Sequence, residues 1–181
     1  MKNVYLILTQ SGTLLSKLIR FFSHKPYNHA SIALDKSLDK FYSFGRLKPH
    51  NAFIGGFVIE RKDAGVFKIF KNAPSLVVEL SITDEQYDTI SNTIKVFEQN
   101  KEEYKYDFVN LTIFFTKYRI PRKKRFFCSQ FVSYILNNAG IKTPNPPEHT
   151  QATDFLSLEN SRVIYNGFIQ EYNIEKTTSI T

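Results

Sequence analysis

Short apolar runs and alternating segments predict the strands, most of them in the first half of the chain. Residues 4–8 form an apolar run that turn-forming residues end, which is typical of a buried strand. Residues 29–35 alternate, with apolar side chains at 30, 32 and 34 on one face and mostly polar ones on the other. The adjacent Gly55 and Gly56 indicate a bend or a close backbone approach. Further strands are expected at 40–44, which Gly45 ends, and at 57–61, 66–70, 76–82 and 162–165.

Apolar residues spaced three and four positions apart predict the helices. One helix is expected over about residues 83–103, with Thr83 or Asp84 as its N-cap and acidic residues in its first turn. Another begins close to Cys128 and ends before Gly140, because glycine suits the position just after a helix. The remaining helical candidates are residues 14–22, 106–118 and 154–158. The apolar stripe of the first of these is short, which favours packing on the sheet over lying on a membrane.

This succession of elements predicts an α+β fold in a single domain that spans residues 1–181. Hydrophobic residues make up 42% of the 181-residue chain and aromatic residues 15%, which is enough for a real core and excludes an intrinsically disordered chain. The sequence contains no internal repeat and no composition shift that would mark a domain boundary.

The single cysteine excludes an intramolecular disulfide framework and a multi-cysteine zinc module. The apolar run at 4–8 is too short for a secretory leader. No window approaches the roughly 18 to 20 apolar residues that a membrane-spanning helix needs. The sequence therefore predicts a cytoplasmic protein without a transmembrane segment.

The net charge of +7, from 24 Lys and Arg against 17 Asp and Glu, permits an anionic partner without requiring one. Residues 119–125, a predicted loop with five basic residues, hold the main local concentration of positive charge. No recognition-helix, zinc-finger or RNA-binding signature accompanies them, so we expect a solvated loop and no specific nucleic-acid partner.

Cys128 lies at the predicted first turn of an amphipathic helix, within the sequence FFCSQFV. Free backbone N–H groups and the positive end of the helix dipole stabilise a thiolate at such a position. The basic residues 122–125 would add positive potential if they fold near it. The structural alternative is that Cys128 is a buried small hydrophobic residue, as free cysteines usually are.

Four histidines are available as a partner for the thiol: His24, His29, His50 and His149. His29 begins the alternating strand and projects from its polar face, where an imidazole can meet the end of a neighbouring helix. The other three lie in polar or proline-rich connecting segments, and isolated histidines are mostly structural or surface residues. Their spacing matches no metal-binding motif, so neither a metal nor another cofactor is expected.

The segments around these two residues resemble the permuted papain-like branch of the NlpC superfamily, the YiiX-like proteins. The resemblance rests on Asn28-His29-Ala30-Ser31-Ile32-Ala33-Leu34, on Cys128-Ser129-Gln130-Phe131-Val132 and on Tyr106-Asp107-Phe108, and it covers about residues 4–165. It implies an antiparallel sheet carrying the histidine, packed against a helix carrying the cysteine, in the reverse of papain's order. It also implies that Cys128 is the nucleophile and His29 its base, with backbone N–H groups stabilising the oxyanion.

Such sites use a third polar residue to orient the imidazole, often on the neighbouring strand. Ser43, in the strand expected at 40–44, has the parity to lie beside His29 and is the candidate. Asp35 shares the face of His29 but would be about 20 Å away along the strand. Tyr106 is a candidate substrate-binding residue, with a half-buried aromatic anchor as the alternative.

The resemblance implies a cysteine hydrolase, an amidase or peptidase that acts on a peptide-like or acyl-bearing substrate through an acyl-enzyme. A lipid acyltransferase or deacylase of the same fold is an alternative, because the many Phe and Tyr side chains would suit an acyl pocket as well as a core. A module that binds peptide or lipid without turnover is a third hypothesis, favoured by the lack of an acidic third residue among the candidates.

Overall fold

Eight strands form one mixed sheet, which confirms the α+β class. The computed structural model describes residues 1–10, 26–48, 51–70, 72–114, 116 and 118–177. The strands are β1 (Lys2–Thr9), β2 (His29–Ala33), β3 (Phe41–Lys48), β4 (Asn51–Glu60), β5 (Pro74–Ile82), β6 (Lys105–Tyr106), β7 (Arg125–Phe126) and β8 (Ser161–Phe168). Their order is β7-β6-β4-β3-β2-β1-β5-β8, and neighbours are antiparallel except for β6 and β7.

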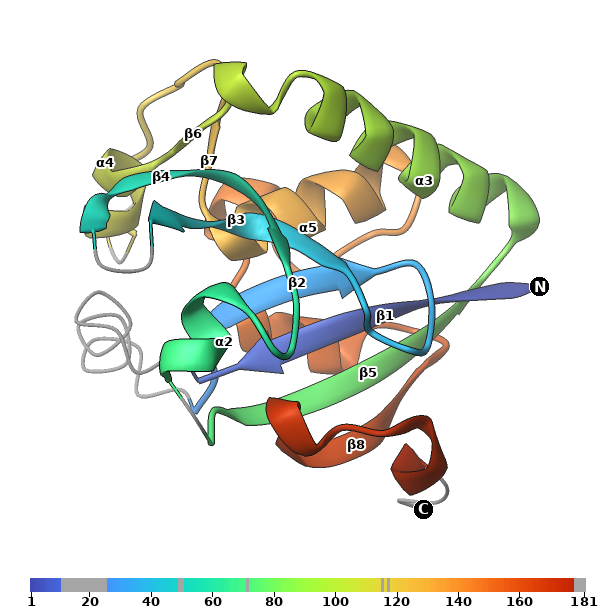
Figure 1. The fold of residues 1–181 in the computed structure, drawn as a ribbon. Coiled ribbons are helices and arrows are strands. Elements are labelled where there is room, and N and C mark those ends of the chain that lie inside the picture. Colours follow the sequence, from blue (N-terminus) through green and yellow to red (C-terminus); the bar gives the residue numbers. More distant parts are fainter. Residues whose placement is uncertain (11–25, 49–50, 71, 115, 117, 178–181) are drawn as a thin grey trace.

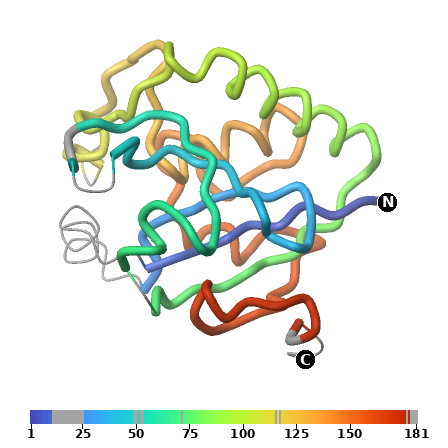
Figure 2. Tube along the Cα trace, in the orientation of Figure 1, coloured from blue at the N-terminus to red at the C-terminus, as the bar shows by residue number. Residues whose placement is uncertain are grey.

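The centre of the sheet brings together strands that are far apart in the sequence. β1 pairs with β2 on one side and with β5 on the other, so Leu6 lies between Ile32 and Val78. Figure 2 shows β1 in dark blue and β5 in green running side by side. The position of β2 beside β1 fixes His29 opposite Thr9, at one end of the sheet.

Two long helices cover one face of the sheet, α3 (Asp84–Gln99) and α5 (Cys128–Asn138) (Figure 1). α3 begins with a capping box, in which Thr83 accepts a hydrogen bond from the Gln86 N–H and the Gln86 side chain accepts one from the Thr83 N–H. α5 ends at Asn138, and Gly140 just after it has a φ of +76°. The Gly140 N–H donates to the Asn137 carbonyl and the Ile141 N–H to the Leu136 carbonyl, which closes the helix. The predicted ends of both helices are therefore close to the observed ones.

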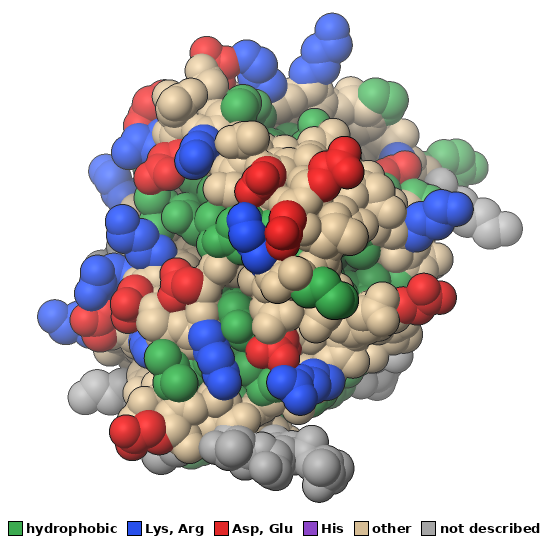
Figure 3. Space-filling model, turned by 90° about the vertical axis from the view of Figure 1, so that its right-hand side faces the viewer, with side chains coloured by type: hydrophobic (Ala, Val, Ile, Leu, Met, Phe, Trp, Pro, Cys, Tyr) green, Lys and Arg blue, Asp and Glu red, His purple; other side chains and the backbone are tan. Residues whose placement is uncertain are grey.

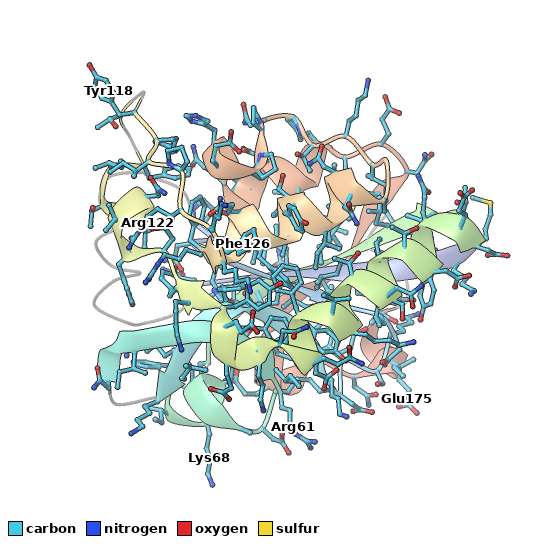
Figure 4. The ribbon with its side chains drawn as sticks, turned by 90° about the horizontal axis from the view of Figure 1, so that it is seen from above. Arg61, Lys68, Tyr118, Arg122, Phe126 and Glu175 are labelled. Atoms are coloured by element: carbon cyan, nitrogen blue, oxygen red, sulfur yellow. The ribbon has the colours of Figure 1, made fainter. Side chains whose placement is uncertain are left out.

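The α5-side core fills the space between the sheet and these two helices. Its centre is a group of aromatic rings, in which Phe44 and Phe57 from the sheet meet Phe97 of α3 and Phe131 of α5 with centroids 5.1 to 6.0 Å apart. In Figure 4, Phe126 lies between α3 and α5, consistent with its ring contacts to both helices. These aromatic residues serve as core, which removes them as a reason to expect an acyl pocket.

The α2-side core covers the opposite face of the sheet with shorter elements. Phe67 of α2 (Gly65–Ile69) packs here with Phe41, Val77 and the C-terminal Ile169 and Tyr172. The other described helices are α4 (Phe108–Thr112) and the 3-10 turns η1 (Lys101–Glu103), η2 (Pro147–His149), η3 (Ala152–Ser157), η4 (Ile169–Glu171) and η5 (Ile174–Thr177). The strand predicted at 162–165 is part of β8, and the short helix predicted at 154–158 is η3.

Gly55 and Gly56 mark a close backbone approach, as their sequence indicated. A Cβ atom on Gly55 would lie 2.7 Å from Cβ of Tyr106, and one on Gly56 would lie 2.7 Å from the Tyr104 carbonyl oxygen. At this crossing point of side chains, β6 lies beside its partner strand β4 at a distance that only glycine permits. This crossing brings Tyr106 next to the start of α5.

Three expectations from the sequence are wrong or only partly right. Residues 66–70 belong to α2 and not to a strand, because the run buries a single large side chain, Phe67, while Ile69 stays 43% exposed. β3 does not end at Gly45 but continues to Lys48, since Gly45 pairs with Gly56. The helix considered at 106–118 is confined to α4, and the one expected at 14–22 lies outside the described residues.

Within the part of the chain that the structure describes, every helix is too short or too polar to cross a bilayer. On the face shown in Figure 3, cationic and anionic side chains are interspersed over the surface. The excess of seven positive charges is therefore not gathered into one patch on that side of the protein.

Candidate active site

Cys128 is the first residue of α5, where the sequence placed it. The preceding Phe127 is extended, with φ −101° and ψ 169°, and its N–H donates to Gln130 Oε1 at 3.3 Å. The Ser129 hydroxyl donates to the Thr150 carbonyl at 2.6 Å and ties the first turn to the following loop. The first N–H groups of a helix have no partner within it, and they give this end of α5 a positive potential.

The Cys128 thiol lies against the beginning of β2. The side chain is 4% exposed, and its sulfur donates to the Asn28 carbonyl oxygen at 3.9 Å. Burial raises the pKa of the Cys128 thiol, but a hydrogen bond and the charge of His29 outweigh burial and leave that pKa below its ordinary value. Backbone N–H groups of Ala30 and Ser129 lower the pKa further, because they donate to the thiolate. The sulfur therefore lies in a site that favours its charged form.

His29 meets the thiol on one side and a carboxylate on the other. Its Nε2 lies 3.0 Å from Oε1 and 3.1 Å from Oε2 of Glu60, and both side chains are nearly buried, at 13% and 12% exposure. Burial lowers the pKa of His29, but the charge of Glu60 and hydrogen bonds to Cys128 and Glu60 raise it well above its ordinary value. A positively charged imidazole is therefore stable beside the thiol.

Glu60 was not among the residues expected from the sequence. It is the last residue of β4, two strands away from β2, so its carboxylate reaches His29 across β3. The backbone of β3 at this crossing is Gly45, where an added Cβ would lie 3.9 Å from His29 Cε1 and 3.8 Å from Glu60 Oε1. The signals available in the sequence were an acidic residue after three apolar ones in the strand predicted at 57–61, and the glycine that follows the strand predicted at 40–44.

Ser43 does not orient the imidazole as expected, and Glu60 has that position. Ser43 is fully buried, and its hydroxyl donates to the Ala30 carbonyl at 2.7 Å. Ile32 pairs with Tyr42 between β2 and β3, next to the point where this hydroxyl bridges the two strands. Ser43 therefore stabilises the backbone of the strand that carries His29.

Tyr106 lies on the other side of the thiol. It is 6% exposed, and its ring packs against Phe108 with centroids 4.7 Å apart. Burial raises the pKa of Tyr106 well above its ordinary value, and the charge of Cys128 and a hydrogen bond to it raise it further. The phenol thus remains protonated and donates toward the sulfur. Its predicted role in binding substrate stays a prediction.

The basic segment before Cys128 is held by acidic partners. Arg122 Nη1 donates to Asp107 Oδ1 at 3.1 Å, and Lys124 pairs with Glu103. Figure 4 shows Arg122 close to α4, whose N-cap is Asp107. The positive charge of this segment is therefore partly neutralised within the fold.

The remaining histidines do not enter this site. His149 Nδ1 lies 3.1 Å from Nη2 of Arg119, in the loop after α5, while His24 and His50 lie outside the described residues. Across the described ranges, no three His, Cys, Asp or Glu side chains are grouped so that they would hold a metal ion.

Comparison with known proteins adds no identity: the chain matches no protein-family model and no curated protein. The resemblance to the permuted papain-like proteins therefore rests on the residues of this chain alone. In this arrangement a carboxylate contacts an imidazole, and the imidazole contacts a thiol at the start of a helix. Such an arrangement can activate sulfur as a nucleophile.

Proposed function

We propose that this protein is a cysteine hydrolase, an amidase or peptidase, of the permuted papain-like NlpC type. The observation that supports this proposal best is the contact of His29 Nε2 with the Glu60 carboxylate at 3.0 and 3.1 Å, on an imidazole that also shifts the pKa of the Cys128 thiol downward. A structural cysteine in a core needs neither partner. The order of the elements, with the histidine strand before the cysteine helix, agrees with the family resemblance.

In the proposed reaction, the Cys128 thiolate attacks the carbonyl carbon of an amide and forms a C–S bond. The carbonyl oxygen takes the negative charge, and backbone N–H groups at the start of α5 stabilise it. Because Nε2 is held by Glu60, we assign the proton exchange to Nδ1 of His29, which protonates the leaving nitrogen as the C–N bond breaks. Water then gives a proton to His29 and attacks the acyl-enzyme, which releases the acid and restores the thiolate and the imidazolium.

Glu60 acts in this scheme as a positioning residue, since it contacts the imidazole and not the substrate. Its charge makes up for the acidic third residue that was missing among the candidates from the sequence. The argument for a binding module without turnover is weaker for that reason. The aromatic residues that would have suited an acyl pocket lie in the α5-side core, so no specific observation favours the lipid-enzyme alternative.

The decisive experiment measures alkylation of Cys128 by iodoacetamide near neutral pH. We expect fast, stoichiometric labelling of the native protein and a fall of about 100-fold or more in His29→Ala, because the imidazole no longer stabilises the thiolate. His149→Ala is the matched control, since that histidine contacts Arg119 and not the thiol. Equal, slow labelling of all three proteins would refute an activated nucleophile.

A second measurement separates turnover from binding. The native protein is incubated with a panel of chromogenic peptide amides and with carboxylic and lipid esters, and intact mass spectrometry detects an acyl group on Cys128. Release of amine from amides supports the hydrolase. Preference for lipid esters would move the protein to the acyltransferase or deacylase branch, and an activated thiol that forms no acyl adduct with any of them would favour a binding module.

A further inference from the structure

Ser31 contacts the same carboxylate as His29. The two residues are separated by one position on β2, so both side chains project from the same face of the strand. Ser31 Oγ lies 2.5 Å from Glu60 Oε2 and 3.3 Å from His29 Nε2. Ser31 is fully buried, although the sequence alone made it only one of several polar residues on that face.

The hydrogen-bond roles in this cluster follow from its chemistry. An ionised carboxylate only accepts hydrogen bonds, so the hydroxyl of Ser31 donates to Glu60. A hydroxyl that donates to a carboxylate forms a short, charge-assisted bond, and 2.5 Å is typical of that class. Glu60 therefore accepts from two donors on alternate positions of one strand, His29 Nε2 and Ser31 Oγ, and the Ser31 hydroxyl holds the carboxylate in contact with His29.

We infer that Ser31 is a fourth member of the site, a positioning residue that keeps the Glu60 carboxylate aimed at His29. The inference rests on the proposed function, because it matters only if the thiol is activated. Ser31 acts on the thiol through two other side chains. It fixes the Glu60 carboxylate, the carboxylate favours the His29 imidazolium, and the imidazolium favours the Cys128 thiolate. The groups that face this chain of contacts are Cys128, Glu60 and, beyond the sulfur, Tyr106.

The fold gives this serine a task that a hydrophobic residue could not perform. Glu60 reaches over β3 at Gly45 to meet His29, and the Ser31 hydroxyl meets the Oε2 end of its carboxylate. Without that hydroxyl, Oε2 would lose a strong hydrogen-bond donor in a nearly buried place. The carboxylate would also be free to rotate away from Nε2.

The test is the pH dependence of iodoacetamide labelling in Ser31→Ala. We expect the apparent pKa of the Cys128 thiol to rise by about 0.5 to 1 unit, so that the labelling rate below that pKa falls about 3- to 10-fold. Ser75→Ala is the matched control, since Ser75 is also fully buried on the sheet but donates to the Ala73 carbonyl. The control should lose a similar amount of stability and keep the native pH profile.

A double-mutant cycle shows whether the effect passes through the carboxylate. In a Glu60→Gln background, Ser31→Ala should have almost no further effect on the thiol pKa, because the charge it supports is already gone. Additive effects would overturn the inference, as would an unchanged pH profile in Ser31→Ala. If Ser31→Ala does not fold, Ser31→Thr replaces it. The retained hydroxyl should keep the native pH profile of labelling, and a shifted pH profile in Ser31→Thr would contradict the role given to Ser31.

These outcomes are distinct from failure of the proposed function. If the native thiol reacts no faster than an ordinary cysteine, the hydrolase proposal fails and Ser31 has no chemistry to support. If the native thiol is activated and Ser31→Ala behaves like Ser75→Ala, the hydrolase proposal stands and only the role of Ser31 is refuted.

Discussion

Two acidic side chains in this protein are held by a basic group at nearly the same distance, and they serve different ends. Glu60 lies 3.0 Å from His29 Nε2, and Asp107 lies 3.1 Å from Arg122 Nη1. Their exposure is also low in both cases, at 12% and 1%. Distance and burial alone would not tell which of the two belongs to a reactive centre.

The difference lies in the partners of each pair. Asp107 accepts from Arg122 and also from the Asn110 N–H and side-chain amide at 3.1 and 2.7 Å. Asn110 in turn bonds both backbone groups of Ile120, so this cluster ties α4 to the loop that precedes Cys128. His29 instead has a side chain that can bind and release a proton, and it touches a thiol. One cluster holds backbone segments together, and the other brings a titratable imidazole to the thiol.

Removing Asp107 should give the largest change in stability. In Asp107→Ala, Arg122 loses its partner and α4 loses its N-cap, so we expect the free energy of unfolding to fall by about 3 kcal/mol. Urea unfolding measures this loss. Asp63→Ala is the control, because its pair with Arg61 is exposed and such pairs contribute little to stability. A loss as small as that of the control would show that the Asp107 cluster does not hold the fold together.

Removing the charge of Glu60 should have a smaller effect on stability and a clear one on reactivity. The raised pKa of His29 stabilises the fold below about pH 6.5, and this contribution is lost as the pH rises through the folded-state pKa. The lowered pKa of Cys128 has the opposite sign: its contribution is present above the ordinary thiol pKa and is lost as the pH falls through the folded value. The thiolate–imidazolium pair therefore exists between the two folded-state values.

Glu60→Gln should narrow the pH range in which the thiolate–imidazolium pair exists. The neutral amide favours the imidazolium less, which lowers the pKa of His29, and the weaker imidazolium supports the thiolate less, which raises the pKa of Cys128. We expect iodoacetamide labelling near pH 6.5 to fall about 10-fold, and the acidic limb of its pH profile to move upward by about one unit. The alkaline limb of the pH profile for amide hydrolysis should also move to lower pH. Glu79→Gln is the control, since that buried carboxylate pairs with Arg162 away from the thiol. Identical profiles for the two variants would contradict the role given to Glu60.

The sequence predicted those parts of the fold whose cause is local. The alternation from His29, the N-cap at Thr83 or Asp84 and the glycine after α5 each act within a few residues, and the structure has β2, α3 and the end of α5 at these places. The short apolar run at 66–70 was predicted as a strand but lies in α2. Its single buried residue, Phe67, fits either a strand or a helix, so periodicity does not distinguish the two.

The third residue of the site could not be found by the same local rules. Strand parity points only to side chains on the strand next to His29, and there it predicts Ser43. The observed partner, Glu60, lies one strand further and reaches His29 because Gly45 leaves space above β3. Contacts across an intervening strand depend on the twist of the sheet and on the side chains that the strand lacks, and strand alternation contains neither.

The smallest effect is expected for Ser43→Ala, which tests the two interpretations of that residue directly. Its hydroxyl donates to the buried Ala30 carbonyl, so the variant should lose about 1 kcal/mol of stability in urea unfolding. The pH profile of iodoacetamide labelling should stay native, because Ser43 touches the backbone of β2 and not the imidazole. A rise in the thiol pKa comparable to that of Glu60→Gln would show that Ser43 does orient His29. In that case, the Ser43 hydroxyl would favour the thiolate as much as the Glu60 carboxylate does. The Glu60 cluster would then no longer differ from the structural contacts in its effect on the thiol.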